Sequence, residues 1–168
     1  AFACSAMSRG ESSGRPHVLN QEIGIRVATL DDAAALADLS GQLDYPVTRP
    51  EMLARLHVLL RRSHYGVLVA CMQGRVVGWV AVEQRLSLEG GARTELVGLV
   101  VDAQRRGGGV GGYLLGAAEQ WAIARGATQL GLRSNVIRTR AHAFYEAHGY
   151  VREKSQHMYG RSLPAEAE

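Results

Sequence analysis

A run of apolar residues that leads into a glycine-rich turn and then a helix most constrains the fold of this chain. Residues 94–102, TELVGLVVD, are apolar nearly throughout, which predicts a central strand covered on both faces. The next residues, DAQRRGGGVGG, hold five glycines within the six positions 107–112. Apolar residues then recur at helical spacing from Val110 to Trp121, and Gly126 ends the predicted helix. The chain therefore contains a strand–turn–helix unit of a sheet domain.

The flanking segments predict more strands and helices around this unit. Thr29 and Thr48 are each followed three residues later by an acidic residue, a capping-box spacing that predicts the start of a helix. A last helix is predicted around 141–148. The predicted strands are 23–29, 65–72, 75–85, 94–102 and 128–135, with one or two more within 150–161. This order of elements predicts one α/β or α+β domain.

Length and charge limit the class of protein. The chain has 168 residues, of which 46% are hydrophobic, and this suits a single domain with a sizeable core. A net charge of +3 is too small for a nucleic-acid-binding surface, and no apolar run is long enough to cross a membrane. No metal-ligand spacing is present in the sequence. We expect a cytoplasmic protein with a flexible arm at 1–22, a folded domain at 23–163 and a tail at 164–168.

The glycine-rich turn has the setting of an anion site. Free N–H groups in the first turn of a helix, together with the helix dipole, attract an anion, and glycines let it approach the backbone. Arg105 and Arg106 add charged donors at the rim. The alternative is a flexible surface turn with both arginines in water. The cost of ordering five glycines directly before an amphipathic helix favours the anion site.

Two common phosphate motifs fit this turn poorly. A P-loop needs Gly-Lys followed by Ser or Thr, and none is present. Gly107, Gly109 and Gly112 match the G-x-G-x-x-G spacing of a dinucleotide fold. That fold also needs an acidic residue about 20 positions further on, yet no Asp or Glu stands between Glu119 and Glu146.

A third interpretation rests on a family resemblance. Residues 100–115, VVDAQRRGGGVGGYLL, resemble the acyl-CoA-binding motif of the GNAT superfamily of N-acetyltransferases. The family pattern is Gln or Arg, two residues, Gly, one residue, then Gly or Ala. Gln104, Gly107 and Gly109 satisfy it, and Arg106, Gly109 and Gly111 satisfy it again in a shifted frame.

A second motif strengthens the resemblance. Residues 141–150, AHAFYEAHGY, are similar to the C-terminal GNAT pattern through Ala141, Tyr145 and the pair Gly149 and Tyr150. The family often has an asparagine seven residues before the tyrosine, but Arg138 stands there in this chain. Asn135, ten residues before the tyrosine, suggests a loop about one turn longer.

The resemblance implies a fold and an activity. The implied fold is a central mixed, mostly antiparallel sheet of about six to seven strands flanked by about four helices. The implied activity is N-acetyl transfer from acetyl-CoA to a primary amine, by direct attack in a ternary complex and without a metal. A non-catalytic acyl-CoA-binding domain of the same fold stays open, as does a nicotinamide-dependent enzyme.

The resemblance also implies which residues hold acetyl-CoA. The backbone of 99–101 is expected to pair with the pantetheine arm like an added strand, and an amide near Leu99 or Val100 to stabilise the oxyanion. Residues 107–112 are expected to hold the diphosphate at the helix N-terminus. The expected cofactor-binding residues are Leu99, Val100, Val101, Gln104, Arg105, Arg106, Gly107, Gly108, Gly109, Val110, Gly111, Gly112, Asn135, Arg138, Ala141 and Tyr145.

Two side chains are the expected catalytic residues. Tyr145 matches the family tyrosine that protonates the departing thiolate, although it can also be read as a core aromatic residue beside Phe144. Glu95 stands where the histone-acetylating members carry a glutamate, and it is the expected base. A solvated strand-end charge is the alternative for Glu95, and Glu83 or a chain of water molecules is the alternative base.

The sequence leaves the amine acceptor open. By resemblance, LDYPVTRPE (43–51) and EKSQHMYGR (153–161) shape the acceptor site, and acidic residues around it favour a cationic amine. Those residues are Asp44, Glu51, Glu89 and Glu95. A small molecule or a peptide amine is the expected acceptor, with no nucleic acid or membrane partner, for a monomer or a homodimer.

Overall fold

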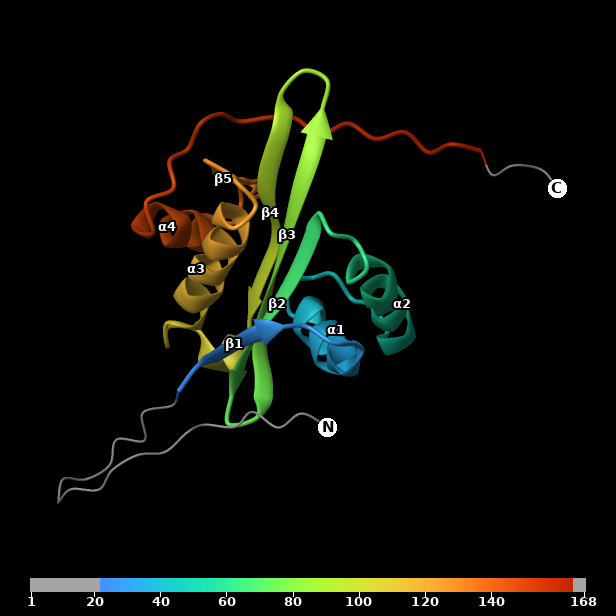
Figure 1. Cartoon of the computed structure of the whole chain (residues 1–168), viewed down its shortest axis with the longest axis vertical. Helices are drawn as coiled ribbons and strands as arrows, with labels where there is room; N and C mark the ends of the chain where they lie inside the picture. Colours follow the sequence, from blue (N-terminus) through green and yellow to red (C-terminus); the bar gives the residue numbers. More distant parts are fainter. Residues whose placement is uncertain (1–21, 165–168) are drawn as a thin grey trace. The chain divides into compact units, whose positions relative to one another are not determined.

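A five-stranded sheet organises the first part of this protein, whose structure is a computed structural model (Figure 1). The strands are β1 (Gly24–Val27), β2 (Tyr65–Met72), β3 (Arg75–Ser87), β4 (Gly91–Val101) and β5 (Leu130–Leu132). They lie side by side in the order β1-β2-β3-β4-β5. The first four pair antiparallel, whereas β5 pairs parallel to β4. The mixed, mostly antiparallel sheet is confirmed.

The structure describes residues 22–164, in two compact units that divide between Arg133 and Ser134. The first unit holds the sheet, α1 (Ala33–Gly41), α2 (Arg49–Leu59) and α3 (Val110–Ile123), and the second holds α4 (Thr139–Ala147). These four helices agree with the expected number. Nearly all of the expected N-terminal arm, and residues 165–168 of the expected tail, lie outside the described residues.

The expected number of six to seven strands is wrong for the described part of the chain, since its sheet has five. Residues 150–161, which were predicted to supply one or two strands, contain no regular secondary structure. Nearly all of these residues are exposed, and Met158 and Tyr159 are 99% and 91% accessible. A strand is stabilised mainly by burying one face and by pairing, and this charged segment buries almost none of its side chains.

Helices cover both faces of the sheet in the first unit (Figure 1). Val67 and Val69 of β2 belong to a buried cluster with Leu36 of α1 and Leu56 of α2. Side chains alternate along a strand, so the neighbouring residues face α3. On that face α3 approaches β3 closely, because Gly78 leaves room for Leu114.

Gly78→Ala is expected to lower the free energy of unfolding by about 2 kcal/mol. The added Cβ would lie 2.7 Å from the Val100 carbonyl oxygen and 2.9 Å from Leu114 Cδ1, so backbone must move. Gly41→Ala is the matched control, because its Cβ meets nothing within 4 Å. Denaturant unfolding of both variants tests this, and equal stabilities would contradict the close packing at Gly78.

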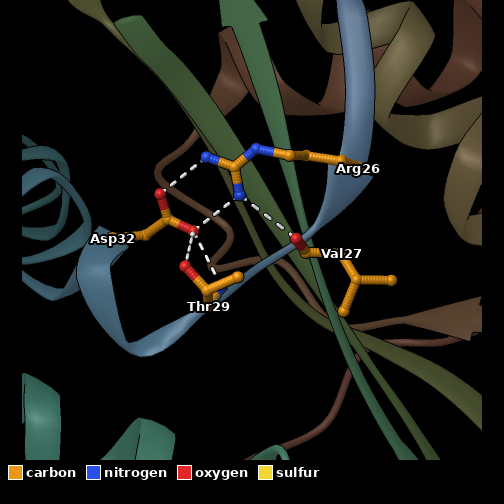
Figure 2. A network of polar contacts seen from close by, with 4 residues as sticks. All are labelled: Arg26, Val27, Thr29 and Asp32. Atoms are coloured by element: carbon orange, nitrogen blue, oxygen red, sulfur yellow. Dashed lines mark hydrogen bonds and ion pairs between the residues drawn. The ribbon is translucent and has the colours of Figure 1, made fainter. Parts of the chain in front are cut away.

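A buried carboxylate ties β1 to the turn before α1 (Figure 2). Asp32 accepts two hydrogen bonds from the Arg26 guanidinium, at 2.7 and 2.8 Å, and one from the Thr29 amide at 2.8 Å. Burial by itself raises the pKa of Asp32, but the bonds from Arg26 and Thr29 outweigh it, so the pKa lies below its usual value. The expected capping box at Thr29 is confirmed, and so is the one at Thr48 with Glu51.

Asp32→Asn is expected to cost about 2–3 kcal/mol of stability at neutral pH, because it leaves Arg26 without its charged partner. The folded state holds Asp32 ionised at a lower pKa than the unfolded chain does. This contribution is therefore complete above the unfolded pKa and is lost as the pH falls below about 4. Denaturant unfolding between pH 3 and 7 measures both effects. Asp31→Asn at the exposed neighbouring position serves as the control, with an expected change under about 0.5 kcal/mol.

Candidate functional site

The short edge strand β5 covers only part of β4, and we call the place where β5 ends the fork. β5 pairs with β4 only from Thr94 to Leu96. On the β3 side, Leu96 pairs with Val82 and Gly98 with Ala81, so Val97 is an extra residue that forms a β-bulge. A bulge bends its strand and increases the local twist. Beyond it, β4 continues beside β3 alone within the described residues.

One edge of β4 faces away from β3 beyond the end of β5. The Asp102 amide donates to the Val77 carbonyl of β3. Because backbone groups alternate between the two sides of a strand, Val100 also points toward β3, whereas Leu99 and Val101 point away from it. The Val101 carbonyl accepts a hydrogen bond from Arg106 Nε at 3.2 Å. Of the three residues expected to pair with pantetheine, Leu99 and Val101 thus present their backbone groups outward.

The turn after β4 is ordered by local hydrogen bonds. The Asp102 carboxylate accepts from the Gln104 amide at 3.1 Å and caps a short 3₁₀ turn, η2 (Ala103–Arg105). The Ala103 amide donates to Gln42 Oε1 from the end of α1, at 2.8 Å. Gly107 and Gly109 have φ angles of 84° and 82°, which are strained for any residue with a Cβ. These two glycines let the chain turn sharply into α3.

The first turn of α3 has free amides. Gly109 is the N-cap, and no side chain caps the helix. The Tyr113 amide donates to the Gly109 carbonyl, but within residues 22–164 the amides of 110–112 meet no protein acceptor. A Cβ placed at Gly107 would meet nothing within 4 Å, so the space around the turn is open. Donors, helix dipole and open space together can hold an anion.

Glu95, the expected base, lies on β4 two residues before the bulge, in a network of charges. Its carboxylate is 16% exposed and lies 2.8 Å from Arg133 Nε and 3.3 Å from Arg85 Nη1. Glu83, the alternative base, pairs directly with Glu95 across the two strands, and its carboxylate is 3.5 Å from Arg85 Nε. Arg85 therefore lies between two carboxylates that would otherwise repel each other.

Sequence reasoning missed two aromatic residues on the same face of the sheet. Tyr65 pairs with Glu83 across β2 and β3. Burial, together with the charge of Glu83, raises the pKa of the Tyr65 phenol. Trp79 packs over Gly98, where an added Cβ would lie 2.8 Å from Trp79 Cζ3. The buried Trp79 indole N–H has no acceptor in the described part of the chain, so this face retains an unsatisfied donor. Only the register of the strands could have revealed these residues.

The remaining expected residues lie in the second unit. Tyr145 is on α4, where burial raises the pKa of its phenol and the charge of Arg138 partly offsets this. Its ring makes an edge contact with Phe144, with centroids 5.2 Å apart. Asn135 organises the turn before the helix: its side-chain oxygen accepts from the Ile137 amide at 3.2 Å, and its carbonyl accepts from the Arg138 amide at 3.0 Å. The residues expected to bind acetyl-CoA are thus divided between the two units. Four of them lie in the second unit: Asn135, Arg138, Ala141 and Tyr145.

Comparison with known proteins identifies the family. The model of the acetyltransferase (GNAT) family matches residues 33–150, which include the fork, the glycine turn and α4. The chain belongs to the acetyltransferase (GNAT) family. The expected family is confirmed, and so is the expectation of an acyltransferase.

Relatives of known function are N-acetyltransferases. Aminoglycoside N(6')-acetyltransferase type 1 of Stenotrophomonas maltophilia is 32% identical over 147 residues, which cover 84% of this GNAT chain and 94% of the relative. Aminoalkylphosphonate N-acetyltransferase of Salmonella typhimurium is 33% identical over 132 residues, which cover 75% of this chain and 83% of the relative. A solved aminoglycoside N-acetyltransferase in complex with CoA has a TM-score of 0.79 at 19% identity, covering 89% of this chain and 99% of its own. It shows the GNAT fold.

Two further properties of this GNAT chain concern metals and membranes. Among residues 22–164, no group of His, Cys, Asp and Glu side chains is arranged to hold a metal ion. Within the same range, no helix is both long enough and apolar enough to cross a membrane.

Proposed function

We propose that this protein is an N-acetyltransferase that moves the acetyl group of acetyl-CoA to an amine in a ternary complex. The observation that carries the proposal is the continuity of two features of the first unit. The outward backbone groups of Leu99 and Val101 line the fork, and the free amides of 110–112 follow at the end of the same strand. A long ligand with amides in its arm and phosphates at one end suits both.

Backbone groups would hold most of the donor. The outward groups of Leu99 and Val101 would bind the two amides of the pantetheine arm, and the amides of 110–112 would bind the diphosphate. Arg105 and Gln104 would lie at the rim of this cradle, whereas Arg106 supports it through its bond to the Val101 carbonyl. Asn135, Arg138 and Ala141 remain proposed donor contacts from the second unit. The thioester of the bound donor would supply the acetyl group.

The chain would supply three functions to the reaction. An amide at the fork, near Leu99 or Val100, would stabilise the negative charge that develops on the carbonyl oxygen. Tyr145 would give its phenolic proton to the departing thiolate, and its raised pKa keeps that proton in place at neutral pH. Glu95 would accept the proton of the amine, directly or through water. Holding both substrates side by side would contribute several kcal/mol more.

The names of two relatives support a small amine as the acceptor. One is named for aminoglycosides and the other for aminoalkylphosphonates, and both names describe a primary amine on a polar small molecule. We propose an acceptor of this kind, bound on the sheet face that carries Tyr65, Glu83 and Glu95.

The test is the release of thiol from acetyl-CoA across a panel of amines, together with thermal stabilisation by CoA. Amine-dependent thiol release with formation of an N-acetyl product supports the proposal. Stabilisation by CoA without turnover on any amine would instead indicate a non-catalytic acyl-CoA-binding domain. Stabilisation by NADH but not by CoA would indicate a nicotinamide-dependent enzyme.

A further inference from the structure

We infer that the acceptor carries an anionic group as well as its amine, and that Arg85 is the residue that selects it. The inference rests on the proposed function and deepens it. It starts from a charge cluster formed by Glu83, Arg85, Glu95 and Arg133. Two carboxylates and two guanidiniums make this cluster neutral as a whole.

The charge cluster lies on the sheet face where the acceptor is proposed to bind. Glu83 and Glu95 are cross-strand partners, and Arg133 directly follows the last residue of β5. The cluster therefore stands at the vertex of the fork, beside the bulge. Its glutamates share a face with Tyr65, which packs against the α1 and α2 side of the core. Beyond Tyr65, the first residue of β2, the β3–β4 hairpin that carries Arg85 extends past the rest of the sheet (Figure 1).

The two arginines are held to different degrees. Arg133 binds Glu95 through two nitrogens, Nε at 2.8 Å and Nη2 at 3.4 Å. Arg85 is held more loosely, at 3.3 Å from Glu95 and 3.5 Å from Glu83. Both arginine side chains are open to solvent, Arg85 at 53% and Arg133 at 74% exposure, so the distances distinguish them rather than the exposure. Arg85 is therefore the cation that an incoming ammonium group displaces.

Displacement of Arg85 leaves a charge to be balanced. An ammonium group that binds Glu83 or Glu95 adds a positive charge to a neutral cluster, and the displaced guanidinium then lies next to that ammonium. An anionic group on the acceptor restores the pairing, because a guanidinium binds phosphonate, phosphate and carboxylate oxygens through a planar fork of donors. A second ammonium group in the same place would meet Arg85 as a like charge. The charge cluster thus favours a zwitterionic amine over a polycation.

The experiment compares acceptors of matched length by acetyl transfer and by calorimetric binding in the presence of CoA. The acceptors are 3-aminopropylphosphonate, 4-aminobutanoate, propylamine and 1,3-diaminopropane. We expect the wild type to bind and use the better of the two zwitterions about tenfold more efficiently than propylamine, and the diamine least well. Comparison of 3-aminopropylphosphonate with 4-aminobutanoate shows whether the site prefers a phosphonate or a carboxylate as the anionic group.

Arg85→Met is expected to reduce the preference for the zwitterion over propylamine to within about threefold. The same variant is expected to bind and acetylate the diamine more efficiently than the wild type does. Arg85→Lys is expected to retain part of the preference, because it keeps the charge without the planar fork. The matched control is Arg93→Met, since Arg93 is the cross-strand partner of Arg85 and its guanidinium lies instead against Gly90. It is expected to leave the preference unchanged.

Several outcomes would overturn the inference. A wild type that prefers the diamine, an Arg85→Met variant with an unchanged preference, or no binding of any of the four acceptors would each do so. Absence of turnover with a binding preference that Arg85→Met removes would support the charge selection and refute the proposed acetyl transfer. The two proposals therefore fail separately.

Discussion

Tyr145→Phe is expected to lower kcat about tenfold or more while acetyl-CoA still binds. The substitution removes the one proton that the side chain can give to the thiolate and leaves the ring in place. Burial holds the pKa of the Tyr145 phenol above its usual value, so the wild-type residue stays protonated well into the alkaline range. Steady-state kinetics for kcat and calorimetry for acetyl-CoA binding measure the two effects.

The control for the loss of a phenol is Tyr113→Phe, which removes the hydroxyl of a side chain on α3 that is 59% exposed. We expect no change in kcat for this variant. An unchanged kcat in Tyr145→Phe would remove Tyr145 from the mechanism and leave it as a core aromatic residue beside Phe144. If product release limits kcat, a slower chemical step does not change kcat. The same variants are therefore also measured in a single turnover, which reports the chemical step directly.

Gly109→Ala is expected to raise the KM for acetyl-CoA about tenfold or more and to change kcat much less. Gly109 is the N-cap of α3 at a φ of 82°, where a residue with a Cβ costs about 1–2 kcal/mol. Relief of that strain would turn the amides of 110–112 away from the proposed diphosphate site. Initial rates against acetyl-CoA concentration measure the change.

Gly74→Ala is the control that separates the effect of backbone strain from the effect on acetyl-CoA binding. Gly74 has a φ of 76° in the turn between β2 and β3, and a Cβ there meets nothing within 4 Å, whereas one at Gly109 makes only an ordinary contact with Tyr113, at 3.9 Å. Both substitutions therefore cost similar stability, but only Gly109→Ala should weaken acetyl-CoA binding. Equal KM values for the two variants, each at wild-type level, would rule out a diphosphate site at this turn.

Local patterns were enough to predict most of the first unit. The capping boxes at Thr29 and Thr48, the apolar strand before the glycine turn and the periodic helix after it all occur where they were expected. Such elements are specified by residues close together in the chain. The prediction of strands within 150–161 was wrong, because whether a segment pairs with a distant strand is not encoded in its local sequence.

The surroundings of the candidate base could not be predicted in this way. Arg133 reaches Glu95 across 38 positions of sequence, and Arg85 lies between two glutamates only because β3 and β4 pair in one particular register. A shift of one residue would turn the side chains of one strand to the other face. The sequence thus singled out Glu95 as a charged residue of the candidate site, but it did not predict the ion pairs of Glu95 with Arg85 and Arg133.

By itself, the sequence determined the family and the glycine-rich turn before α3, because both reside in short motifs with a defined spacing. The tertiary structure decided what those motifs face. Strand β5 ends beside Leu96, directly before the bulge at Val97, and the register across β2, β3 and β4 brings Tyr65, Glu83 and Glu95 into one row. Charges interact through space rather than along the chain, so only the folded sheet determines which of them become partners.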